Sequence, residues 1–141
     1  MTYPRYVIEK CGSFDEKYEG NIAEDADFSF RVRKLGFRLI VDPDLQLIHE
    51  NVGGTAFPYS EHDVYYSALN NVYFFFKNLY DGKARSLIGF TKATIYMFGI
   101  HLIGGLVYKR PCIGLFYFRG IVNGFRRMRL LMKNSLVTSI R

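Results

Sequence analysis

Hydrophobic spacing of three to four predicts a helix over residues 24–35. The apolar positions fall at i, i+4 and i+7, namely Phe28, Val32 and Leu35. This spacing places them on one face of a helix. Gly36 follows directly and provides a natural helix stop.

The first turn of this predicted helix is acidic. Asp25 and Asp27 lie where the helix dipole favours negative charge, and Asp27 precedes Arg31 by four residues, so the two can pair. An acidic helix start of this kind is most often a solvated turn. From the acids alone, a functional site is therefore the less favoured interpretation.

Alternation of apolar and polar residues predicts short strands. We expect them at residues 6–8, 37–41 and 45–49, the last ending on His49 on its apolar face. Asp42-Pro43-Asp44 predicts a turn between the second and third strands. A lone histidine on an apolar strand face is most often a core residue rather than a ligand.

The second half of the chain predicts helices. Ser60-Glu61-His62-Asp63 is typical of a capping box that begins a helix reaching about Leu79. Asp81-Gly82 interrupts the chain, residues 86–108 are mostly apolar, and Pro111 begins a further helix to about Lys133.

The segment 86–108 is long enough to span a bilayer, for which about twenty residues are needed. Lys92 and His101 interrupt it, so interfacial helices and a buried helical hairpin are the alternatives. The helix over 111–133 separates its side chains into a cationic and an apolar face, which is typical of a membrane-surface helix. The cations are Arg119, Arg126, Arg127, Arg129 and Lys133, and the apolar residues are Phe118, Ile121, Phe125, Met128 and Met132.

Charge divides the chain. Residues 1–63 hold 7 basic and 12 acidic residues (net −5), whereas residues 64–141 hold 12 and 1 (net +11). The apolar character of the basic half favours an anionic membrane surface over nucleic acid, whose binders place cations on a polar face. Cys11 and Cys112 form no metal-binding spacing and indicate either a reducing compartment or nothing at all, and no secretory signal is visible.

The ordered string of motifs over residues 10–54 resembles the C-terminal half of the catalytic domain of family 2 glycosyltransferases, which are inverting enzymes. The matching residues are Cys11-Gly12-Ser13-Phe14-Asp15-Glu16, Glu24-Asp25-Ala26-Asp27, Arg31, Gly36-Phe37-Arg38, Pro43 and His49. A weaker likeness to rhamnosyltransferase-like members continues through residues 65–78. Cys11 stands where the family usually has the first of two glycines.

The resemblance implies an α/β fold: a partial GT-A domain over residues 1–58 without its N-terminal nucleotide-binding half. Residues 59–141 would follow as a helical, basic, membrane-associated extension. A doubly wound sheet cut in this way would leave an open edge and an uncovered apolar face, so we expect the isolated chain to be poorly soluble or to need a partner.

The resemblance also implies site residues. Asp25 matches the catalytic base, Glu24 and the loop Gly12, Ser13 and Phe14 would line the acceptor pocket, and His49 matches a metal-binding position. The divalent cation would be Mn²⁺ or Mg²⁺ and would be held mostly by the missing half; an imidazole ligand favours Mn²⁺.

The function implied is that of a glycosyltransferase fragment, inactive alone, that moves a sugar from a nucleotide-diphosphate donor to a glycan or lipid-linked acceptor. We expect it at the cytoplasmic face of the cell membrane, peripheral or interfacial. The alternatives are a non-catalytic membrane-associated module and, less favoured, a nucleic-acid binder driven by the basic half.

Overall fold

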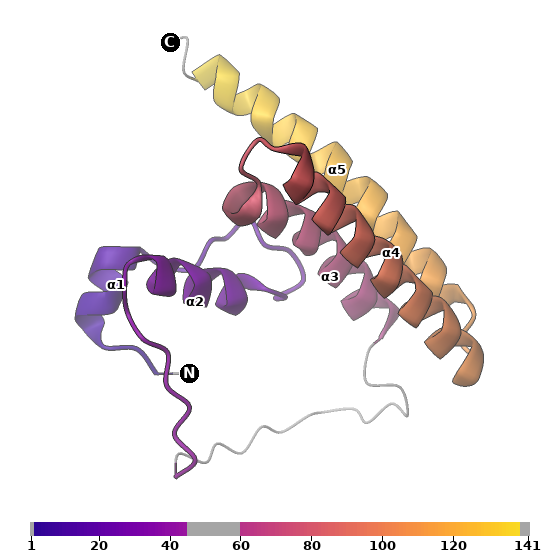
Figure 1. Ribbon diagram of the computed structural model, residues 1–141, viewed down its shortest axis with the longest axis horizontal. Helices are drawn as coiled ribbons and strands as arrows, with labels where there is room; N and C mark the ends of the chain where they lie inside the picture. Colours follow the sequence, from indigo (N-terminus) through magenta and orange to yellow (C-terminus); the bar gives the residue numbers. More distant parts are fainter. Residues whose placement is uncertain (1, 45–59, 139–141) are drawn as a thin grey trace.

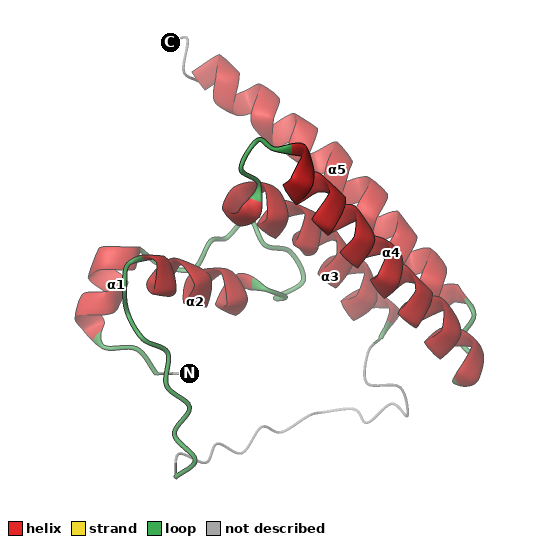
Figure 2. Ribbon diagram, in the orientation of Figure 1, coloured by secondary structure: helices red, strands yellow, loops and turns green. Residues whose placement is uncertain are grey.

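The computed structural model describes residues 2–44 and 60–138, and every regular element in these residues is helical (Figures 1 and 2). Two short helices, α1 and α2, lie to one side, and three longer ones, α3 to α5, pack together on the other. The elements in chain order are α1 (Arg5–Cys11), α2 (Glu24–Lys34), α3 (Glu61–Phe74), the π-helical turn η1 (Phe75–Leu79), α4 (Ala84–Val107) and α5 (Cys112–Thr138).

The predicted α/β fold is therefore wrong: residues 2–44 and 60–138 contain no strand, and so no partial GT-A sheet. Residues 37–41 form an extended loop, in which Val41 is 93% exposed. A strand of this length needs a neighbour to pair its backbone and a core to cover one face. Among the described residues no strand pairs with this segment, and after Phe37, which packs on the Val7 cluster, its apolar side chains are exposed. The strand predicted at 45–49 lies outside them.

The strand predicted at residues 6–8 is also wrong, because this segment belongs to α1. Tyr6 and Ile8 are exposed, and Val7 between them is buried. Val7 packs with Phe28 and Val32 of α2 in a small apolar cluster. A run of three apolar residues is too short to distinguish a strand from one turn of a helix.

Helix α2 confirms the helix predicted for residues 24–35. Phe28 and Val32 are buried on the predicted face, whereas Leu35, assigned to the same face, is 52% exposed directly after the last helical residue. Gly36 follows with φ 87°. The predicted pair between Asp27 and Arg31 is present, with Arg31 Nε donating to Asp27 Oδ2 at 2.9 Å. The turn predicted at 42–44 is present too, since the Asp44 amide donates to Asp42 Oδ1 at 3.0 Å.

Helix α3 begins with the predicted capping box. The Asp63 amide donates to Ser60 Oγ at 3.1 Å, and the Ser60 amide donates to Asp63 Oδ2 at 3.0 Å. The helix continues into η1, where the Tyr80 amide donates to the Phe75 carbonyl at 2.9 Å. The prediction of a helix from residue 61 to about Leu79 is therefore confirmed.

Glycines let α5 pack closely on α3. A Cβ atom added at Gly120 would lie 2.4 Å from the Tyr65 carbonyl oxygen, and one at Gly124 would lie 2.9 Å from the Leu69 carbonyl oxygen. The core between these helices consists of Val64, Ala68, Val72, Ile113, Tyr117 and Ile121. Helix α4 packs on this core with Phe90, Met97 and Phe98.

The apolar face of α5 is used only in part inside the protein, since Phe118, Phe125 and Met132 are exposed. Ile121 is part of the buried core and Met128 packs against it. Arg127, assigned by the sequence to the cationic face of a membrane-surface helix, lies against α3 and the loop before α2. It pairs with Glu19 at 3.2 Å and lies over the Tyr73 ring. Packing on α3 therefore accounts for Ile121 and Met128 of the amphipathic pattern.

Candidate functional site

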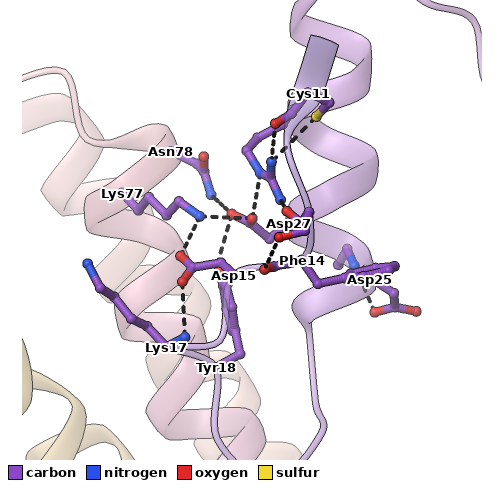
Figure 3. Close-up of polar contacts among 12 residues, drawn as sticks. Cys11, Phe14, Asp15, Lys17, Tyr18, Asp25, Asp27, Lys77 and Asn78 are labelled. Carbon is purple, nitrogen blue, oxygen red and sulfur yellow. Dashed lines mark hydrogen bonds and ion pairs between the residues drawn. The ribbon is translucent and has the colours of Figure 1, made fainter. Parts of the chain in front are cut away.

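A buried carboxylate, Asp27, joins α2 to the C-terminal helices (Figure 3). Its side chain is 0% exposed and accepts four hydrogen bonds. Tyr18 and Asn78 donate to Oδ1 at 3.1 and 2.7 Å, and Arg31 and Lys77 donate to Oδ2 at 2.9 and 2.8 Å. All of its acceptor capacity is directed at protein groups, so Asp27 is a structural residue rather than a base open to substrate.

Lys77 extends this network to a second acid. Its Nζ lies 2.7 Å from Asp15 Oδ2, which also accepts a hydrogen bond from Tyr73 Oη at 2.8 Å. Two carboxylates, Asp15 and Asp27, thereby face two cations, Lys77 and Arg31, so the charges balance. Balanced, fully hydrogen-bonded charges are the arrangement in which buried ions are tolerated.

The acids of this network are held ionised. Burial raises the pKa of Asp15, but hydrogen bonds from Lys77, the Lys17 amide and Tyr73 outweigh it and lower the pKa to about 2. Burial likewise opposes ionisation of Asp27, and hydrogen bonds from Lys77, Asn78 and Arg31 lower its pKa. The same environment raises the pKa of Tyr18, which stays protonated and donates to Asp27.

Arg31 ties the predicted acceptor loop to α2. Its Nη1 donates to the Cys11 carbonyl at 2.6 Å and its Nη2 to the Ser13 carbonyl at 2.7 Å. Between them, Gly12 ends α1 with φ 78°, a left-handed conformation that glycine adopts without strain. Phe14 packs its ring 4.9 Å from that of Phe28 and remains half exposed.

The loop that leads into α2 is fixed by a buried amide. Asn70 of α3 is 0% exposed; its Nδ2 donates to the carbonyls of Glu19 and Ile22 at 2.7 and 2.8 Å, and its Oδ1 accepts from the Glu19 amide at 3.2 Å. The next residue, Ala23, has φ 73°, which is unusual for a residue with a Cβ atom. The entry into α2 is therefore set by tertiary contacts rather than by a capping side chain.

Asp25 differs from Asp27 in exposure and in hydrogen bonding. It is exposed, and Figure 3 shows its side chain pointing away from the cluster around Asp27. The hydrogen bond that its carboxylate accepts within the described residues comes from the next amide, Ala26, at 2.7 Å. Its neighbour Glu24 is half-buried, and Oε2 of Glu24 accepts no hydrogen bond from the described part of the chain.

The structure thus places Gly12, Ser13 and Phe14 on one loop that Arg31 holds against α2, the helix that carries Glu24 and Asp25. His49 lies outside the described residues. Within residues 2–44 and 60–138, no cluster of three histidine, cysteine or acidic side chains could hold a metal ion.

Sequence reasoning missed the roles of Asp15, Tyr18, Lys77 and Asn78. Lys77 lies 50 residues from Asp27 along the chain, and no spacing rule links the two. Two signals in the sequence pointed to this network. Asp15 and the Lys77-Asn78 pair belong to the stretches that carry the resemblance, and the spacing of Asp27 and Arg31 predicted their ion pair.

The network makes the free energy of unfolding depend on pH in the acidic range. Because the pKa of Asp15 is about 2 in the folded protein and about 3.9 in an unfolded chain, its ionised form stabilises the fold above about pH 4, by about 2 kcal/mol. This stabilisation is lost as pH falls from about 5 to about 2. We expect urea unfolding followed by circular dichroism to show this loss, and Asp15→Asn to reduce it, with Asp27 responsible for acid dependence that remains. A free energy of unfolding that is constant over this pH range would contradict the assignment.

Comparison with protein-family models, curated proteins and solved structures finds no match for this chain.

Proposed function

We propose that this chain forms the acceptor and base side of an inverting sugar-transfer site, with Asp25 as the base. The observation that carries the proposal is the contrast between two aspartates in the first turn of α2. Asp27 is buried and consumed by four hydrogen bonds, whereas Asp25 two residues earlier is exposed at the helix start. A base must reach a substrate hydroxyl, and Asp25 is free to do so.

In the proposed reaction, an acceptor hydroxyl oxygen attacks the anomeric carbon of the donor sugar. The new carbon–oxygen bond forms as the bond to the diphosphate oxygen breaks on the opposite face, which inverts the configuration. Asp25 takes the hydroxyl proton late, when the oxygen has become acidic. The positive end of α2 stabilises the Asp25 anion before that transfer.

The acceptor would lie between Asp25 and the loop of Gly12, Ser13 and Phe14. Arg31 supports this placement because it bonds both the loop carbonyls and Asp27, which fixes loop and helix as one unit. The exposed ring of Phe14 offers an apolar surface to an acceptor, and Glu24 offers a second carboxylate. This proposal needs only that local arrangement and no sheet.

A nucleotide-binding part outside these 141 residues would hold the nucleotide-sugar donor. A divalent cation, Mn²⁺ or Mg²⁺, would neutralise the leaving diphosphate there, with His49 as one ligand. The described residues contribute no such centre, because Asp15 and Asp27 are already paired with Lys77 and Arg31. No step assigned to Asp25 depends on the ion.

The alternative function is a non-catalytic, membrane-associated module that keeps the same scaffold. The exposed apolar surface of α4 favours it. Two unpaired thiols, Cys11 and Cys112, fit a reducing compartment and hence the cytoplasmic face of the membrane for either function.

The test begins with the DNA upstream of the Met1 codon, translated in all frames to find the donor-binding part. With both parts combined, Mn²⁺, labelled nucleotide sugars and a membrane extract as acceptor source, we expect sugar transfer. Asp25→Asn should lower the rate by about 100-fold or more, because it removes the base. Glu16→Gln, the same loss of charge at an exposed acid, should leave the rate unchanged.

Transfer that survives Asp25→Asn would remove Asp25 as the base. If the combined parts, shown to be folded, transfer none of the labelled sugars offered, the non-catalytic alternative takes the place of the proposed function.

A further inference from the structure

Helix α4 presents an apolar face that no described residue covers. Phe90, Met97 and Phe98 point to the core, whereas the opposite side of the helix is open, with Tyr96 and Val107 each 69% exposed. The exposed apolar residues of this outer face are Ile88, Ile95, Tyr96, Ile103, Leu106 and Val107. The helix is long and apolar enough to cross a membrane, and no part of its apolar window is buried in the protein.

Cations border this face. The exposed cations of α5, which runs beside α4 (Figure 1), are Arg119, Arg126, Arg129 and Lys133. At 100° per residue they fall within about 80° of one another on the helix. Further cations lie at the two ends of α4, namely Lys83, Arg85, Lys109 and Arg110. One exposed cation, Lys92, lies within the outer face itself, where its long side chain can extend to the headgroups. From residue 64 onward the chain has 12 basic residues and 1 acidic residue.

We propose that α4 lies in the plane of an anionic membrane surface, with its outer face inserted at the boundary between headgroups and acyl chains. An apolar stripe flanked by cations is the surface that such an interface binds. Nucleic acid would match the cations but would leave the isoleucines and Tyr96 in contact with water. A second copy would match the apolar face but would bring like-charged borders together.

A trans-bilayer orientation is disfavoured by what packs on α4. Helix α5 lies alongside it and carries the exposed cations, so a span would draw Arg119 or Arg126 toward the hydrocarbon core. Each cation there costs about 2.5–3.5 kcal/mol. An in-plane helix keeps these cations at the headgroups, where they attract anionic lipid.

Because the chain has no tryptophan, a single tryptophan introduced by substitution reports its own surroundings by fluorescence. Tyr96→Trp places one fluorophore on the outer face of α4, and Tyr6→Trp places one at an exposed tyrosine of α1 as the matched control. With phosphatidylcholine vesicles that contain phosphatidylserine, we expect the emission of the Tyr96→Trp variant to shift to the blue and to be quenched by acyl-chain-brominated lipid. The Tyr6→Trp variant should show neither change, and vesicles of phosphatidylcholine alone should bind less.

Two sets of variants separate the apolar and charge contributions. Ile95→Lys together with Ile103→Lys should lower vesicle binding at least tenfold without loss of helix, because both side chains are exposed. Arg126→Gln and Arg129→Gln should each lower binding to the anionic vesicles about fivefold. Asp25→Asn should leave binding unchanged, since membrane binding is independent of sugar transfer.

Three results would overturn the proposal. Tryptophan emission of the Tyr96→Trp variant that is unaffected by anionic vesicles would exclude insertion. A dimer in lipid-free buffer that shields the tryptophan of this variant from aqueous quenchers would assign the face to a second copy. Resistance to extraction with alkaline carbonate would indicate a span instead of an interfacial helix.

Discussion

Asp27→Asn is expected to destabilise the protein by about 3–5 kcal/mol, as removal of one partner from a buried ion pair typically does. The substitution removes the charge that Lys77 and Arg31 share and turns one acceptor oxygen into a donor facing donors. Lys77 retains its ion pair with Asp15, but Arg31 loses its carboxylate partner. Urea unfolding followed by circular dichroism measures the change.

Asp25→Asn is the matched control for this prediction. It is the same substitution two residues earlier on the same helix, at an exposed side chain, and should change the free energy of unfolding by no more than about 0.5 kcal/mol. Equal destabilisation by the two substitutions would show that Asp27 does not join the two parts of the protein.

Gly120→Ala is expected to destabilise the protein by about 1–3 kcal/mol, although alanine normally favours helices over glycine. The added methyl group would meet the Tyr65 carbonyl at 2.4 Å and the Ala68 side chain at 2.7 Å. Because the first of these is backbone, α5 must move away from α3, which opens the core around Val64 and Ile121. Thermal unfolding measures the loss.

Gly89→Ala on α4 is the control, because nothing lies within 4 Å of the position of its added Cβ atom. It should stabilise the helix by about 0.5–1 kcal/mol. The opposite signs of the two changes distinguish close packing from helix propensity. A stabilising effect of Gly120→Ala would contradict the packing of α5 on α3.

The sequence predicted features that depend on neighbours along the chain. The periodicity of Phe28 and Val32 predicted α2, Ser60 and Asp63 predicted the start of α3, and the spacing of Asp27 and Arg31 predicted their ion pair. In each case the partners are three or four residues apart, which is the range over which a helix brings side chains together.

What could not be predicted depends on contacts between distant segments. The α/β fold was implied by the resemblance, and its strands were predicted from stretches of three to five residues, but no sheet is present in the described part of the chain. Asp27 accepts hydrogen bonds from Lys77 and Asn78 because the fold brings α2 beside η1, which is about 50 residues away along the chain. The apolar stripe of α5 correctly predicted a helix but not that α3 would cover part of the stripe, at Ile121 and Met128.

The most direct test of the central proposal is the sugar-transfer rate of Asp25→Asn, measured on protein whose unfolding curve has been recorded. We expect an unfolding midpoint equal to that of the wild type and a transfer rate lower by about 100-fold or more. An unchanged rate with an unchanged midpoint would contradict the assignment of Asp25 as the base.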